Sequence, residues 1–84
     1  MNHFATPRFW ALYRRLSPEV QDLADSNFQI LKDNPRHASL RLKKVARFWS
    51  VRIGRGHRAL AVQSDKGLLW FWIGTHAEYD HLIR

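Results

Sequence analysis

Four side chains in the second half of the chain could act together on a phosphodiester: Arg52, Arg58, His76 and Tyr79. Metal-free cleavage of such a bond needs a base for the attacking hydroxyl, an acid for the leaving oxygen, and cations for the charge that develops on phosphorus. Arg52 and Arg58 lie on either side of a Gly-Arg-Gly turn, so we expect them on neighbouring strands with guanidinium groups able to converge on one phosphate. His76 is the candidate acid or base because imidazole titrates near neutral pH, and Tyr79 follows one helical turn later.

Each of these residues also has an interpretation that involves no chemistry. Arg52 and Arg58 fit ordinary exposed strand arginines. His76 fits a surface residue at the start of a helix. Tyr79 could donate a hydrogen bond, stack on a base, or simply pack with Leu82 against the sheet edge. The residues alone therefore hint at catalysis without establishing it.

Basic residues dominate the middle of the chain. The formal net charge is +7, and no acidic residue occurs between Pro35 and Ser64. Such one-sided charge is typical of a protein that binds a polyanion, because each neutralised phosphate releases counterions. The same block fits an acidic protein partner, or a solvated surface that only aids solubility. For nucleic acid, the further candidate contacts are Arg41, Lys43, Lys44, Arg47 and Arg55.

Composition excludes several other kinds of site. The chain has no cysteine, which rules out disulfides, thiolate metal sites and a cysteine nucleophile. His3, His37 and His81 show no ligand spacing and there is no glycine-rich phosphate loop, so we predict neither a metal site nor a cofactor. The 84 residues predict a single domain over residues 1–84. Without a signal peptide or an apolar run of about 20 residues, we predict a cytoplasmic protein with no membrane partner.

Two helices are expected first. Thr6-Pro7 and Ser17-Pro18 each read as an N-cap followed by proline at the first helical position. Apolar residues then recur at helical spacing, up to Leu16 in the first segment and up to Asn34-Pro35 in the second. The tight link predicts an αα-hairpin. Six residues form the expected apolar face of the second helix: Val20, Leu23, Ala24, Phe28, Ile30 and Leu31.

The pattern then changes to the alternation that is typical of strands. Strands are expected at residues 39–45, 48–53, 57–63 and 68–73, with glycine turns at residues 54–56 and 64–67. Thr75 and Glu78 have the spacing of a capping box, so a short helix should follow. The sequence therefore predicts an α+β fold in which an N-terminal αα-hairpin packs on an antiparallel β-meander of about four strands, with a short C-terminal helix.

The last expected strand, residues 68–73, is apolar on both faces. A strand with one face in solvent should alternate with polar residues. One interpretation is a central strand that the chain itself covers on both sides. The other is that the two helices cover only one face and part of the second face is left for a partner.

The predicted layout resembles the RelE/ParE superfamily of toxins from bacterial toxin–antitoxin systems. The segment Trp-Ser-Val-Arg-Ile-Gly at residues 49–54, followed by Gly-His-Arg-Ala-Leu at 56–60, is similar to the family's central hairpin. Residues 70–80, Trp-Phe-Trp-Ile-Gly-Thr-His-Ala-Glu-Tyr-Asp, are similar to its closing segment. The resemblance extends from about Phe4 to Ile83 and implies a RelE-like fold.

The resemblance implies roles for these residues. RelE-like members cleave messenger RNA, usually on the ribosome, with strand lysines and arginines and a C-terminal His or Tyr. By that pattern Arg58 matches the hairpin arginine, Arg52 a strand cation, and His76 and Tyr79 the catalytic segment. Ser50 lies where some members carry a second strand lysine, which puts the cleavage rate and ribosome dependence in question.

Together with these residues, the resemblance implies a toxin that acts as a metal-independent, ribosome-dependent endoribonuclease on messenger RNA and so inhibits translation. The resemblance also implies a cognate antitoxin that wraps the basic, partly apolar surface in a toxin–antitoxin hetero-oligomer. ParE-like members instead poison DNA gyrase without cutting RNA, and this is the first alternative. A nucleic-acid-binding module without catalytic activity is the second.

Overall fold

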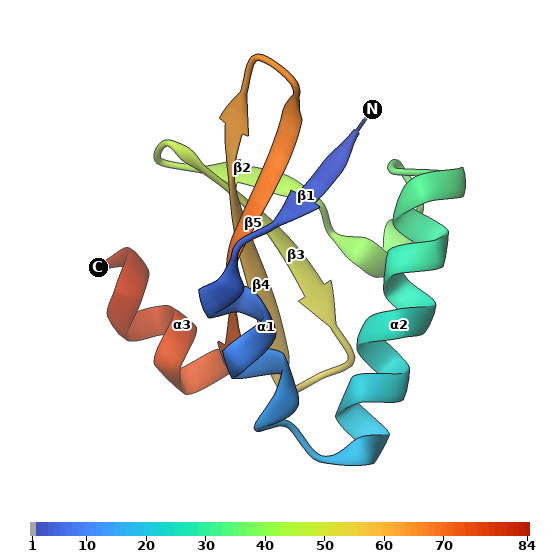
Figure 1. Cartoon of the computed structure of the whole chain (residues 1–84), viewed down its shortest axis with the longest axis vertical. Helices are drawn as coiled ribbons and strands as arrows, with labels where there is room; N and C mark the ends of the chain where they lie inside the picture. Colours follow the sequence, from blue (N-terminus) through green and yellow to red (C-terminus); the bar gives the residue numbers. More distant parts are fainter. Residues whose placement is uncertain (1) are drawn as a thin grey trace.

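A mixed sheet with helices on both faces makes up the part of the chain that the computed structural model describes, residues 2–84 (Figure 1). The strands run in the order β1-β5-β4-β3-β2, with β1 parallel to β5 and the other neighbours antiparallel. The predicted α+β class, meander and C-terminal helix are confirmed. The strands are β1 (His3–Ala5), β2 (Lys43–Val45), β3 (Phe48–Ile53), β4 (His57–Ser64) and β5 (Gly67–Thr75). The helices are α1 (Pro7–Arg14), α2 (Pro18–Asp33) and α3 (His76–Ile83), with a 3₁₀ turn η1 (Ala38–Leu40).

The two N-terminal helices begin where their caps predict. The Thr6 hydroxyl accepts a hydrogen bond from the Phe9 N–H at 3.1 Å, and Ser17 does the same for Val20 at 3.3 Å. The helices then diverge over the sheet, because α1 packs on β5 whereas α2 packs on β3. Within residues 2–84, every helix is too short or too polar to cross a lipid bilayer.

β1 is absent from the sequence prediction. It holds three residues and pairs with β5, more than sixty positions away, so it leaves no local periodicity. Hydrogen bonds between the backbones continue beyond it, from Thr6 N–H to the Trp70 carbonyl and from Leu68 N–H to the Asn2 carbonyl, both at 2.9 Å. The meander is thus extended into a sheet of five strands in the described chain.

The strand predicted at residues 39–45 is wrong in its first half. Leu40 is fully buried at 0% exposure in η1, which packs against α2 and β3. Arg41, which follows η1, adopts a left-handed conformation with φ 46°. This conformation interrupts the extended backbone before β2. Only Lys43–Val45 pairs with β3. The spacing of Leu40 and Leu42 therefore does not mark an extended strand, because Leu40 is buried in the core as part of a 3₁₀ turn.

The two faces of β5 are both covered by the chain itself. Trp70 is 5% exposed on the side of α2, and Trp72 is 7% exposed on the side of α3. A β-bulge at this point pairs Leu60 with Trp72 and Ala61 with Trp70, which leaves Phe71 as the extra residue. For Trp70 and Trp72 the interpretation as a central strand that the chain itself covers on both sides is therefore correct, and neither tryptophan is left for a partner. We call the two sides of the sheet the α2 face and the α3 face.

Candidate active site

Arg52 and Arg58 stand directly opposite each other on β3 and β4. Both lie on the α3 face, because side chains alternate along a strand and Leu60, two residues after Arg58, packs with residues of α3. Both are half-buried. Arg52 Nε donates to the Gly54 carbonyl and Arg58 Nη1 to the His57 carbonyl, each at 2.9 Å. A guanidinium has five N–H donors, so these bonds position the groups and leave donors for an anion.

Two other arginines, Arg52 and Arg41, influence the pKa of Arg58. Burial lowers the pKa of the Arg58 guanidinium, the positive charge of Arg52 lowers it further, and Arg41 acts in the same direction. Tyr79 and Asp80 oppose this effect. Since arginine stays protonated in proteins, the consequence is a half-buried pair of positive charges with little compensation. A phosphate bridging the two would relieve that repulsion.

The start of α3 is fixed to the turn that carries the arginines. The His76 N–H donates to the Gly56 carbonyl at 2.8 Å. The predicted capping box is present: Glu78 Oε1 accepts from the Thr75 N–H at 2.9 Å, and the Thr75 hydroxyl accepts from the Glu78 N–H at 3.2 Å. The bond from the Thr75 backbone lowers the pKa of Glu78. Glu78 thus caps the helix, and His76 is held at the first position of α3, next to the turn between β3 and β4.

His76 has a partner that the sequence reasoning missed. Its Nδ1 lies 3.3 Å from an Asp80 carboxylate oxygen, and both side chains are about half exposed, 47% and 46%. A carboxylate at one ring nitrogen fixes the ring and directs the other nitrogen away from it. The spacing of His76 and Asp80 could have predicted this contact, because residues four apart lie on one face of a helix. The negative charge of Asp80 also acts to raise the pKa of Arg58.

Tyr79 is buried. Its side chain is 5% exposed and packs in a cluster with Leu60 and Trp72. The ring lies 6.0 Å from the His76 ring, tilted by 39°. A ring that is 5% exposed offers no open face for a base, which favours the packing alternative, but Tyr79 packs on Leu60 and Trp72 and not on Leu82 as predicted, since Leu82 is 51% exposed. A hydrogen bond from the Tyr79 hydroxyl stays a prediction.

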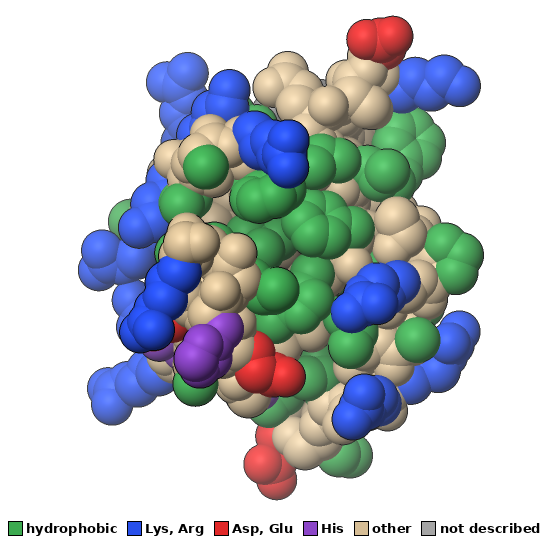
Figure 2. Space-filling model, turned by 90° about the vertical axis from the view of Figure 1, so that its left-hand side faces the viewer, with side chains coloured by type: hydrophobic (Ala, Val, Ile, Leu, Met, Phe, Trp, Pro, Cys, Tyr) green, Lys and Arg blue, Asp and Glu red, His purple; other side chains and the backbone are tan. Residues whose placement is uncertain are grey.

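The other candidate cations divide between the two faces. Lys43 pairs with Ser50 and therefore shares the α3 face with Arg52. Lys44 pairs with Trp49, which packs on the core of the α2 face. Three further cations, all exposed, are Arg41 before β2, Arg47 in the turn between β2 and β3, and Arg55 in the turn between β3 and β4. Figure 2 shows Lys and Arg side chains along one edge of the α3 face, beside an apolar area.

Comparison with known proteins identifies the family. A model of the ParE-like toxin domain matches residues 18–81, a range that includes both arginines and His76. The chain belongs to the ParE-like toxin family. The resemblance to the RelE/ParE superfamily is thereby confirmed. No curated protein matches this ParE-like toxin in sequence.

Solved structures share the fold of this ParE-like toxin. A chain of the RelB–RelE antitoxin–toxin complex from Methanococcus jannaschii matches with a TM-score of 0.73 at 7% identity, covering 96% of this chain and 99% of that one. YafQ from E. coli has a TM-score of 0.69 at 13% identity, covering 93% and 96%. The YoeB/ParE toxin from Agrobacterium tumefaciens has a TM-score of 0.68 at 21% identity, covering 90% and 99%. The RelE-like fold is thus confirmed.

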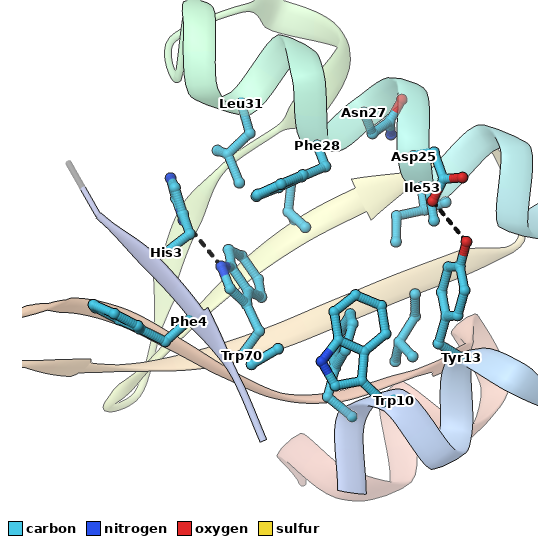
Figure 3. A pocket seen from close by; sticks show the side chains of 15 residues that line it. His3, Phe4, Trp10, Tyr13, Asp25, Asn27, Phe28, Leu31, Ile53 and Trp70 are labelled. Atoms are coloured by element: carbon cyan, nitrogen blue, oxygen red, sulfur yellow. Dashed lines mark hydrogen bonds between the residues drawn. The ribbon is translucent and has the colours of Figure 1, made fainter. Parts of the chain in front are cut away.

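The α2 face of this ParE-like toxin holds a second feature, an apolar groove (Figure 3). A cavity of about 210 Å³ lies between α1, α2 and β1. The Tyr13 hydroxyl donates to Asp25 at 2.7 Å across it, which raises the pKa of Tyr13. Three aromatic residues on its lining are exposed to solvent over slightly less than half of their surface: Phe4 and Trp10 at 45% and Phe28 at 40%.

Two residues expected in the buried stripe of α2 are therefore exposed. Phe28 lines the groove, and Leu23 is 46% exposed. A close αα-hairpin would cover both of them, but α1 leaves α2 to pack on β5. The apolar pattern predicted the helix correctly, but it did not predict which of its apolar side chains the rest of the chain would bury.

Proposed function

We propose that this ParE-like toxin is a metal-independent endoribonuclease that cleaves messenger RNA on the ribosome and so inhibits translation. The observation that carries the proposal is one arrangement on the α3 face. Arg52 and Arg58 are paired across β3 and β4, and the His76 N–H is bonded to Gly56 in the turn that joins these strands, with Asp80 in contact with the His76 ring. This supplies a phosphate site and a titratable group in one place, as cleavage of a phosphodiester requires.

The chemistry assigns a role to each group. Arg58 and Arg52 bind the scissile phosphate and stabilise the charge that develops on its oxygens. His76, oriented by Asp80, exchanges a proton through its second ring nitrogen, either as base for the 2′-hydroxyl or as acid for the leaving 5′ oxygen. The 2′ oxygen attacks phosphorus and the bond to the 5′ oxygen breaks, which yields a 2′,3′-cyclic phosphate and a 5′-hydroxyl. The second proton is exchanged with water.

Two observations favour the gyrase-inhibiting alternative. Ser50, at the position where some RelE-like members carry a lysine, is 2% exposed between Lys43 and Leu60 in the sheet. A buried hydroxyl there provides no positive charge. The matching family model is also described as ParE-like. The α3 face would then bind a protein target without cutting RNA.

Induced expression in bacteria distinguishes the two activities. We expect protein synthesis to stop and messenger RNA to shorten before plasmid supercoiling changes. The readouts are incorporation of labelled amino acid, RNA blots and plasmid topoisomers taken in one time course. Early loss of supercoiling with intact messenger RNA would instead establish the gyrase inhibitor.

The proposed function includes a cognate antitoxin. Two of the similar structures are complexes of this kind, RelB–RelE from Methanococcus jannaschii and DinJ–YafQ from E. coli. The apolar groove on the α2 face offers exposed aromatic side chains of the type that dominate protein interfaces. The net charge of +7 favours an acidic partner segment.

Substitutions in the groove should weaken antitoxin binding without affecting RNA cleavage. Trp10→Ala and Phe28→Ala should each weaken it at least about 10-fold, because large exposed aromatics act as anchors at interfaces. Calorimetry with the antitoxin encoded beside the toxin gene provides the measurement. Lys66→Gln, in the turn between β4 and β5 and not among the residues that line the groove, is the control. Unchanged affinity in both aromatic variants would place the antitoxin elsewhere.

A further inference from the structure

Side chains of β3 and β4 extend the α3 face beyond Arg52 and Arg58 in two parallel rows. Along β3, Phe48, Ser50 and Arg52 alternate onto this face, opposite Val62, Leu60 and Arg58 on β4. Four positions separate Phe48 from Arg52, which is about 13 Å at a rise of about 3.3 Å per residue. The face therefore has a cationic end and an aromatic end.

The aromatic end holds two neighbouring rings. Phe48 and Phe71 have centroids 5.4 Å apart and planes tilted by 53°. Both are partly exposed, although they pack against the cluster around Leu60 and Trp72. Phe71 reaches this face because it is the extra residue of the bulge in β5. A regular strand would direct Phe71 and Trp72 to opposite faces.

Positive charge borders these rings. The Arg47 guanidinium lies 5.6 Å from the centroid of the Phe48 ring. Lys43, paired with Ser50, lies on the same face between the rings and the arginine pair. Figure 2 shows the same combination, an apolar area bordered by Lys and Arg side chains.

We propose that Phe48 and Phe71 form a stacking platform for unpaired bases of single-stranded RNA, with Arg47 and Lys43 contacting its phosphates. The inference rests on the proposed function in taking RNA as the ligand, and it names where the strand runs beyond the scissile phosphate. Single-strand binding sites combine aromatic rings with a cationic track, because every base offers a π face and every nucleotide a phosphate. Cations at both ends of the platform favour a polyanion over an apolar protein segment, which is why we assign this face to RNA.

Equilibrium binding of an uncleavable RNA tests the platform. The probe is a short fluorescein-labelled single-stranded RNA with 2′-O-methyl groups, followed by fluorescence anisotropy. Phe71→Leu removes the ring at similar volume, and we expect affinity to fall roughly 5- to 100-fold, the range for one base–aromatic stack. Phe71→Tyr keeps the ring and should stay within about 2-fold of the original protein, since stacking is retained.

Three matched controls separate stacking from charge and from the rest of the molecule. Lys43→Gln should reduce the slope of log affinity against log salt by about 1, whereas Lys44→Gln, on the opposite face, should leave it unchanged. Trp10→Leu removes an exposed ring from the groove on the α2 face and should not alter RNA binding. Thermal unfolding of each variant checks that its fold is intact.

The outcomes are distinct. Equal affinity in Phe71→Leu and the original protein overturns the proposal, and so does an equal loss in Phe71→Leu and Phe71→Tyr. If Phe71→Leu weakens antitoxin binding and spares the RNA, the face is a protein interface. Because the probe is never cut, a toxin that fails to cleave messenger RNA can still show the stacking effect. Failure of the proposed activity is thereby distinguished from failure of the platform.

Discussion

Replacing Arg58 with Ala is expected to lower messenger RNA cleavage by about 10²- to 10³-fold, the loss typical of one donor to a developing negative charge. RNA affinity should fall as well, with a salt slope reduced by about 1, because the same guanidinium contacts the phosphate before reaction. The physical basis is the position of Arg58, half-buried beside Arg52 and anchored to the His57 carbonyl. Single-turnover cleavage and anisotropy provide the two measurements.

Arg55 supplies the matched control for Arg58. It lies exposed in the same turn between β3 and β4. Arg55→Ala removes the same charge, so we expect a similar change in salt slope but less than about a 10-fold effect on cleavage. Arg58→Lys should recover binding better than cleavage, because an ammonium cannot make the two parallel bonds of a guanidinium. Equal losses for Arg55→Ala and Arg58→Ala would reduce Arg58 to one charge among many.

His76→Gln is expected to cut cleavage by about 10²-fold or more while RNA affinity hardly changes. Glutamine fills a similar volume and retains polar groups but cannot transfer a proton at neutral pH. Asp80→Asn should reduce cleavage by a smaller factor and alter its pH profile, because Asp80 positions the imidazole through the 3.3 Å contact at Nδ1. The measurement is the single-turnover rate across pH.

His81→Gln is the control for His76. His81 is exposed on the same helix, in its last turn. We expect no change in its cleavage rate. If His76→Gln cleaves as fast as the original protein, the site works by position and positive charge alone. If His81→Gln loses activity equally, the effect belongs to α3 as a helix and not to one proton carrier.

Local signals predicted most of the elements. Thr6, Ser17 and Thr75 each cap a helix through a side-chain oxygen, and such capping depends on residues only three positions apart. The alternation over β3 and β4 and the apolar run of β5 likewise mark the extent of these strands within two residues at each end. These features could be predicted because the atoms that determine them are neighbours in sequence.

Features that depend on distant pairing could not be predicted. The short β1 exists only through β5, and Leu40 is buried only because η1 meets α2 and β3. The bulge at Phe71 is a property of two strands together. The apolar groove arises from the divergence of two helices whose individual patterns are ordinary.

The candidate site was predicted in part. The turn placed Arg52 opposite Arg58, and the capping box placed His76 at the start of a helix. Tyr79 illustrates the limit, since an i, i+3 spacing from His76 does not determine whether a side chain faces solvent or the core. Asp80 was overlooked although its spacing from His76 signals a contact.

The central claim is that the α3 face cuts RNA, and the ends of the cut message test it most directly. Purified toxin is added to a translation mixture, and the 3′ ends of the messenger RNA fragments are analysed for their phosphate. The account predicts new fragments ending in 2′,3′-cyclic phosphate, formed by the original protein and nearly absent with Arg58→Ala. Intact messenger RNA, from a protein that blocks gyrase supercoiling in a parallel assay, would contradict it.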